Sequence, residues 1–404
     1  MNEDNKTPLP TLHRTHGTGE RFVARLGCFA IFSLFIYIVS SLSSIALIRI
    51  GNAQYYAGNT KLGTASYTLA LELNRMLKRE VSACYAALTQ EQYQTAVEHC
   101  SEATEIDGAY AAAYSSRGLA YWKLEKYDEA IADFTKDIEL IPVATRSYIN
   151  RGNVYMSLSK YDLAVAEFTQ SIKINSNEQQ AWLNRGFSYI FQGKYDLAVS
   201  DCKKALEVAE KYWNAYFCLG LAYSGQGNYD LALTNYGQAI ELNPNYAPLY
   251  LYRGSIYDTQ QEKSVAIGDY TKAIEFDPNN THAYFARGVI HAVQKEYDAA
   301  LSDFNKAIEI DPKSVDAYVW RGNAYADIEK FDRAMANYEK ALELSDDAKQ
   351  NSYIYCVQGI TYGKMNDYTS AIAALEQGVE LNSGSENDRC KSVFEAARQG
   401  TPVP

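Results

Sequence analysis

Small and aromatic side chains recur along the chain every 34 residues, in positions that stay fixed from one copy to the next. An aromatic residue precedes each recurring glycine by four residues, and an aromatic residue or a histidine follows it by three. An alanine stands twelve residues after each glycine, and an aromatic residue or, once, Cys202 stands sixteen after it. The glycines are Gly118, Gly152, Gly186, Gly220, Gly254, Gly288 and Gly322. Spacings of three and four residues place these side chains on one face of a helix, so the pattern predicts an array of helix–turn–helix units.

Local signals agree with two helices in each unit. An Asp begins the second helix, as in Lys160–Asp162 and Asn228–Asp230, where its charge suits the positive end of the helix dipole. Prolines that cannot continue a helix recur after it, at Pro142, Pro244, Pro278 and Pro312. A glycine inside a helix costs about 1 kcal/mol relative to alanine, so we expect each recurring glycine to lie where the partner helix approaches closely.

This combination of period and motif resembles the tetratricopeptide repeat. The resemblance implies an all-α fold, a right-handed α-solenoid of helix–turn–helix repeats. With each glycine taken as position 8, eight clear units occupy residues 111–384, the last after a three-residue insertion. Residues 44–110 hold two degenerate units with Gly51 and Cys84 at position 8, and residues 385–404 hold a capping helix and a tail. One departure from the family pattern is an arginine before the glycine, at Arg117, Arg151, Arg185, Arg253, Arg287 and Arg321.

A stretch of 23 residues without charge, Leu26 to Ile48, precedes the repeats. A helix of this length spans the roughly 30 Å hydrocarbon core of a bilayer, so we expect residues 26–48 to form one transmembrane helix. A cleaved signal peptide is the alternative interpretation. Basic residues are more frequent before the segment (Arg14, Arg21, Arg25) than after it (Arg49, Lys61). This bias predicts that residues 1–25 are cytoplasmic and that the repeats are extracytoplasmic.

Charge and motif content argue against several classes of function. The net charge is −11, and because residues 1–50 carry +2 the remainder carries −13, a poor surface for nucleic acid. The sequence has no CxxC, P-loop, GxGxxG, GxSxG or HExxH motif. His99 and His282 lack cysteine or carboxylate partners at the usual metal-ligand spacings. We therefore expect no enzymatic activity, no cofactor and no metal.

The resemblance implies that the first helices line a concave binding surface, mainly through positions 2, 5, 9, 12 and 13. These positions lie outside the Gly, Ala and Tyr packing positions, although packing against neighbouring repeats is the alternative role. The set we select comprises Trp122, Asn153, Met156, Phe187, Ile190, Phe191, Phe217, Phe285 and Asn323. An apolar surface of this kind predicts a protein or peptide ligand. The basic residues of the family's carboxylate clamp are absent, so we do not expect capture of a carboxylate.

The function this implies is a membrane-anchored scaffold that holds a peptide segment or assembly intermediate of another protein. Two alternatives stay open: a structural solenoid that self-associates into a homo-oligomer, and a non-catalytic subunit of an envelope complex or enzyme.

Six cysteines lie in the repeats and suggest three disulfide pairs. Cys84 and Cys100 are equidistant from the turn within their unit, and Cys202 and Cys218 from the turn between two units. Residues placed in this way face each other across antiparallel helices. Cys356 and Cys390 share one position in successive first helices. Such helices typically lie about 8–10 Å apart, which is long for a disulfide that needs Cα atoms within roughly 7 Å. The alternative is that these cysteines are small apolar fillers. Disulfides persist in oxidising compartments, in agreement with extracytoplasmic repeats.

Overall fold

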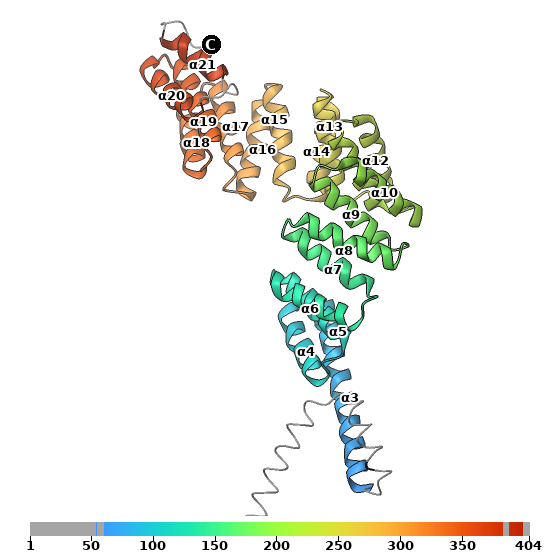
Figure 1. Ribbon diagram of the computed structural model, residues 1–404. Helices are drawn as coiled ribbons and strands as arrows, with labels where there is room; N and C mark the ends of the chain where they lie inside the picture. Colours follow the sequence, from blue (N-terminus) through green and yellow to red (C-terminus); the bar gives the residue numbers. More distant parts are fainter. Residues whose placement is uncertain (1–53, 55–59, 383–387, 399–404) are drawn as a thin grey trace, which may run out of the picture. The chain divides into compact units, whose positions relative to one another are not determined.

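The computed structural model describes Gln54, residues 60–382 and residues 388–398. In this part of the chain there are nineteen helices and no strand (Figure 1). The helices are α3 (Thr60–Thr89), α4 (Tyr93–Ile106), α5 (Ala111–Lys123), α6 (Tyr127–Leu140), α7 (Thr145–Ser157), α8 (Tyr161–Ile174), α9 (Gln179–Phe191), α10 (Tyr195–Val208), α11 (Trp213–Gly225), α12 (Tyr229–Leu242), α13 (Ala247–Thr259), α14 (Lys263–Phe276), α15 (Thr281–Val293), α16 (Tyr297–Ile310), α17 (Val315–Asp327), α18 (Phe331–Leu344), α19 (Ala348–Lys364), α20 (Tyr368–Leu381) and α21 (Asp388–Arg398). The all-α repeat prediction is therefore confirmed.

The expected membrane segment, residues 26–48, and the tail before it lie outside the described residues. None of the helices that the structure describes combines the length and the apolar character needed to cross a membrane.

The repeat is also visible in the backbone of the turns. From α5 to α18, each first helix has 13 residues and each second helix has 14. The second residue after the end of each first helix has a positive φ, the left-handed conformation typical of the chain just beyond a helix C-terminus. These residues, nearly all spaced by 34, are Glu91, Glu125, Ser159, Gly193, Gly227, Gln261, Lys295, Glu329 and Asn366. The chain divides into two compact units, residues 1–184 and 185–404, and each is considered by itself.

The recurring glycine makes room for an aromatic ring of the partner helix. A Cβ atom added at Gly220 would lie 2.4 Å from the ring of Tyr236, and one added at Gly322 would lie 2.6 Å from the ring of Tyr338. Both distances are shorter than a van der Waals contact, so no larger residue fits without displacing the ring. The close approach expected at these glycines is confirmed, and an aromatic side chain makes it.

The arginine before each glycine forms an ion pair inside its own hairpin. The carboxylate lies sixteen residues further on, in the second helix, at 2.7–2.9 Å in Arg117–Asp133, Arg151–Glu167, Arg185–Asp201, Arg253–Asp269 and Arg287–Asp303. Burial raises the pKa of Asp133 and of Glu167, and the neighbouring guanidinium opposes that shift. Arg321 differs, because its Nε donates to the amide oxygen of Asn337 at 2.8 Å.

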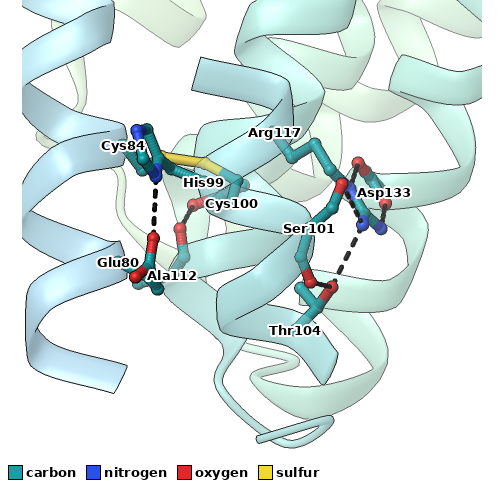
Figure 2. The surroundings of a disulfide bond; sticks show 10 residues. Glu80, Cys84, His99, Cys100, Ser101, Thr104, Ala112, Arg117 and Asp133 are labelled. Carbon is teal, nitrogen blue, oxygen red and sulfur yellow. Dashed lines mark hydrogen bonds and ion pairs between the residues drawn. A yellow bond between two sulfur atoms is a disulfide. The ribbon is translucent and has the colours of Figure 1, made fainter. Parts of the chain in front are cut away.

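Two cysteine pairs join neighbouring helices. A disulfide links Cys84 of α3 to Cys100 of α4, with the Cα atoms 5.3 Å apart (Figure 2). A second links Cys202 of α10 to Cys218 of α11, with the Cα atoms 6.1 Å apart. The third expected pair does not form a disulfide in the structure, and the Cys356 and Cys390 side chains are buried. Their equivalent positions in α19 and α21 belong to side-by-side first helices rather than to one hairpin.

The N-terminal degenerate units depart from the predicted boundaries. Two degenerate units in residues 44–110 require a turn between them, but α3 runs through this region as one helix of 30 residues, Thr60–Thr89. The segment Asn74–Lys78 contains no proline or glycine, and Met76, Leu77 and Lys78 are strong helix formers. Near the other end of the array, the three-residue insertion lengthens the first helix α19 to 17 residues.

Candidate functional site

Five aromatic side chains gather on the first helices of the second unit. We call Phe187 of α9, Trp213 and Phe217 of α11, Tyr252 of α13 and Tyr246, just before α13, the aromatic cluster. The ring centroid of Phe217 lies 6.2 Å from that of Phe187, 6.1 Å from Tyr246 and 5.6 Å from Tyr252. Trp213 lies 4.8 Å from Tyr246. These distances fall in the range of favourable aromatic pairs, so the cluster is one packed group spanning three successive repeats.

The cluster has a buried centre and an exposed rim. Phe217 is only 8% exposed and packs with Tyr236, Leu249 and Ile256. The expectation that Phe217 lies outside the packing positions is therefore wrong, because the ring of α13 residue Tyr252 covers it. Tyr252 is 41% exposed and Tyr246 is 37% exposed. The rim thus offers aromatic surface to solvent on a rigid base.

A buried hydroxyl group beneath the cluster has no hydrogen-bond partner among the described residues. It belongs to Tyr236, which is fully buried and whose ring centroid lies 6.1 Å from that of Phe217. Burial raises the pKa of Tyr236 far above its ordinary value. In the hairpin of Tyr338, Asn323 accepts the equivalent hydroxyl, but the corresponding residue here is Leu221. The cluster therefore rests on an apolar base that leaves one polar atom unsatisfied.

The other predicted groove residues of the second unit lie in different surroundings. Phe191 is 61% exposed, and because it follows Phe187 by four residues it extends the same face of α9. Ile190 is half-buried. The ring centroids of Phe285 and Phe304 are 6.1 Å apart. Asn323 accepts a hydrogen bond from the Tyr338 hydroxyl at 2.8 Å. Only Phe187, Phe217 and Phe191 thus form part of one aromatic surface.

In the first unit, the predicted residues make polar and core contacts. The indole nitrogen of Trp122 donates to the Ser157 hydroxyl at 3.1 Å. Asn153 accepts a hydrogen bond from Asn184 at 2.7 Å. Met156 is half-buried and packs against the cluster around Phe168. No aromatic group comparable to that of the second unit forms around these three residues.

A pocket of about 480 Å³ lies further along the second unit, between α17, α19 and their neighbours. Asn323, Tyr353 and Thr361 give it polar groups, and its lining also includes an ion pair between Lys364 Nζ and Asp327 Oδ1 (2.9 Å). Its volume is within the range of small-ligand sites. Cys356 and Cys390 also line it, and a hydrogen bond from the Cys356 thiol lowers the pKa of Cys390.

Sequence reasoning missed three members of the aromatic cluster: Trp213, Tyr246 and Tyr252. Each stands at a repeat position where most other units carry a small or polar residue. Position 6, for example, is Tyr252 in one unit but Ser116, Asn150 and Asn184 in others. A large aromatic side chain at a position that is elsewhere small was the signal that could have identified them.

Comparisons with known proteins agree with the repeat architecture. Family profiles described as "Tetratricopeptide repeat" match residues 180–212, 213–246, 111–143, 145–178, 247–280, 315–347 and 352–384, and a profile described as "TPR repeat" matches residues 291–328. Together these matches cover more than half of the 404 residues. The search of curated proteins gave no match.

Solved structures of similar fold include a tetratricopeptide repeat protein from Parabacteroides merdae. It is 22% identical, with a TM-score of 0.52, over 65% of this chain and 99% of that one. The C-terminal part of a repeat protein from Cytophaga hutchinsonii is 21% identical, with a TM-score of 0.48, over 60% of this chain and 98% of that one. YrrB, described as a TPR protein with an unusual peptide-binding site, is 26% identical, with a TM-score of 0.36, over 46% of this chain and 95% of that one.

Proposed function

We propose, because the chain belongs to the tetratricopeptide repeat family, that it is a scaffold holding an apolar segment of a partner protein against its aromatic cluster. Proteins with these repeats generally serve as protein-interaction scaffolds. The ligand segment would lie on α9, α11 and α13, with Phe191, Tyr246 and Tyr252 as its contacts.

The observation that carries this proposal is the exposure of large aromatic rings at the first helices α9 and α13, next to the packed Phe217 of α11. Phe191, Tyr246 and Tyr252 are all exposed, although residues of this type bury most of their surface when nothing else is required of them. Aromatic anchors of this kind dominate the free energy of many protein interfaces. Their base is rigid, because Phe217 is packed and the Cys202–Cys218 disulfide ties α10 to α11. A rigid base lowers the entropy lost on binding.

We further propose that residues 26–48 anchor the chain in a membrane and that the repeats are extracytoplasmic. The support comes from the uncharged sequence and from the bias of its basic flanks. The two disulfides, Cys84–Cys100 and Cys202–Cys218, are consistent with an oxidising compartment. The partner would then be another membrane or envelope protein.

The binding surface is tested by a double variant, Phe191→Ser with Tyr252→Ser, in the full-length chain. The matched control is Leu231→Ser, because Leu231 is 47% exposed but lies on the second helix α12, away from the cluster. The tagged proteins are isolated from their own cells, and co-purifying proteins are quantified by mass spectrometry. Loss of two anchors should reduce recovery of the partner roughly tenfold or more, since each costs on the order of 2 kcal/mol at a hot spot.

Equal recovery with the double variant and the control would contradict the proposed surface. Recovery of only further copies of this chain would instead support the self-associating alternative.

The anchor is tested separately by cell fractionation. We expect the full-length chain to stay in the membrane fraction after washing at high pH, and a chain that begins at residue 49 to be released. Release of both chains would contradict the anchor without affecting the binding surface.

A further inference from the structure

Two carboxylates and an imidazole converge beside the Cys84–Cys100 disulfide. Glu80 lies on α3, and His99 and Glu102 lie three residues apart on the same face of α4. One ligand atom from each of these three residues lies within 4.8 Å of the others. The Oε2 atom of Glu80 is 2.7 Å from Nδ1 of His99 (Figure 2). No other such group of three occurs in the part of the chain that the structure describes.

His99 thus has carboxylate neighbours in the fold, although none stands at the usual metal-ligand spacing in the sequence. Glu80 is 19 residues away from His99 in the sequence, and it is the pairing of α3 with α4 that brings the two together. Glu102 is close in the sequence, but three-residue spacing from a single histidine is no metal motif by itself.

We propose that Glu80, His99 and Glu102 bind one divalent transition-metal ion of the Zn²⁺ type. Imidazole nitrogen and carboxylate oxygen are ordinary zinc ligands, and three of them leave a fourth position for water. A nitrogen ligand disfavours Mg²⁺ and Ca²⁺, which prefer oxygen ligands only. Ligand atoms around a tetrahedral zinc ion are roughly 3.3 Å apart, for bonds of about 2.0–2.1 Å. The ligand atoms of His99 and Glu80, now 2.7 Å apart, must therefore separate slightly, and the Glu102 oxygen already lies within 4.8 Å of both.

The surroundings of the group favour a bound cation. Glu80 is only 2% exposed, and a second carboxylate close to a buried one costs free energy that a cation removes. Arg79 donates to the Oε1 atom of Glu80 at 2.7 Å, which offsets part of the negative charge but leaves Oε2 facing His99. The disulfide holds α3 and α4 together one helical turn from Glu80 and next to His99, so the two helices that carry the ligands are held side by side before the ion arrives.

The same protein offers an internal comparison. His291 Nδ1 lies 2.6 Å from Glu296 Oε2, a pair with almost the same geometry as His99 and Glu80. Glu296 is more than half exposed, and no third ligand joins this pair within the described residues. A histidine–glutamate pair alone should not retain the ion, whereas the group of three should.

The experiment measures Zn²⁺ binding to the full-length chain by isothermal titration calorimetry after removal of metal with a chelator. All proteins carry His13→Gln and His16→Gln, so that the N-terminal tail contributes no ligands. We expect one Zn²⁺ per chain, affinity weakened roughly tenfold or more by Glu102→Gln, and binding abolished by His99→Gln. Glu102 is exposed, so its variant tests the site even where Glu80→Gln prevents folding.

Two controls make the result specific. Glu98→Gln changes an exposed acid of α4 outside the group, and His291→Gln removes the pair that lacks a third ligand. Both should bind Zn²⁺ like the parent protein and show the same rise in melting temperature on adding it. One equivalent of Zn²⁺ retained by His99→Gln, or no binding by the folded parent at micromolar Zn²⁺, would overturn the proposal. Equal binding of Mg²⁺ would overturn the assigned class of metal.

Discussion

The hairpins α11/α12 and α17/α18 have the same packing skeleton and use their polar positions differently. In both, a glycine of the first helix receives a tyrosine ring of the second, Gly220 with Tyr236 and Gly322 with Tyr338. The Tyr338 hydroxyl donates to Asn323 at 2.8 Å, whereas the Tyr236 hydroxyl has no partner among the described residues. The skeleton that builds the repeat is therefore independent of the hydrogen bonds around it.

The arginine position shows the same contrast. In α17 it is Arg321, which bonds the amide oxygens of Asn337 and Asn305, and in α11 it is the buried Leu219. Position 5 is Phe217 in α11 and Val319 in α17. The α11/α12 hairpin thus has apolar or aromatic side chains around the cluster at positions where the α17/α18 hairpin has polar or smaller ones. Residues around Phe217 that differ from the repeat pattern, such as Leu219 and Tyr252, locate the candidate site, whereas the glycine and alanine positions locate the core.

Phe217→Ala should have the largest effect on stability. Removing this buried ring should cost about 3–5 kcal/mol in the free energy of unfolding, because a cavity remains under Tyr252 and Tyr246. The equivalent change Val319→Ala removes fewer buried carbons and should cost about 2 kcal/mol. Urea unfolding followed by helical circular dichroism measures both. An equal or smaller loss for Phe217→Ala would show that the ring belongs to the binding surface and contributes little to the core.

Gly220→Ala should cost about 1–3 kcal/mol, because the new methyl group would meet the Tyr236 ring. The matched control is Gly237→Ala in the partner helix α12, where an added Cβ has no neighbour within 4 Å. That change should instead stabilise the hairpin by about 1 kcal/mol through helix propensity. Amide hydrogen exchange in α11 and α12 reports the two effects locally. The same sign for both changes would contradict the packing role of the glycine.

Removing the hydroxyl group should have opposite effects in the two hairpins. Tyr236→Phe removes a buried unpartnered group and should stabilise by about 1 kcal/mol or more. Tyr338→Phe breaks the bond to Asn323 and should destabilise by about 1 kcal/mol. Melting temperatures of the two variants, compared at one pH, measure the difference. Destabilisation by Tyr236→Phe would mean that its hydroxyl has a partner in solution.

The smallest effect concerns the arginine position. The change Asn337→Asp should give Arg321 the carboxylate partner that the other arginines have. We expect it to raise the free energy of unfolding by about 0.5–1 kcal/mol. Asn235→Asp is the control, because both asparagines donate to the carbonyl four residues before them and lose that bond, while the residue sixteen before Asn235 is Leu219 and not an arginine. The free energy of unfolding of the control should therefore not rise. Chemical unfolding at low and high salt tests this, since the gain from the new carboxylate should shrink as salt screens the pair.

The repeat and its register could be predicted from the sequence because the packing constraint recurs. In most copies the recurring glycine meets an aromatic ring of the partner helix, so one spacing in the sequence predicts this contact along the array. The facing of Cys202 and Cys218 follows from the same register, since they are equidistant from a turn.

Other contacts depend on side chains that occur only once. Tyr252 covers Phe217 from the next repeat, and the repeat pattern does not specify how far a ring at position 6 reaches. In the degenerate region, α3 continues where a turn was expected, because no glycine or proline interrupts it. Glu80 and His99 meet in this region, where Cys84 replaces the glycine and the sequence signal is weakest.

The central claim, that the aromatic cluster is the partner-binding surface, is tested most directly by site-specific photo-crosslinking in cells. A photoreactive phenylalanine analogue replaces Tyr252 in one protein and Leu231 of α12, which is slightly more exposed, in another. We predict a cross-linked partner protein from position 252 and none from position 231. The same products from both positions, or products from 231 alone, would contradict the assignment of this surface.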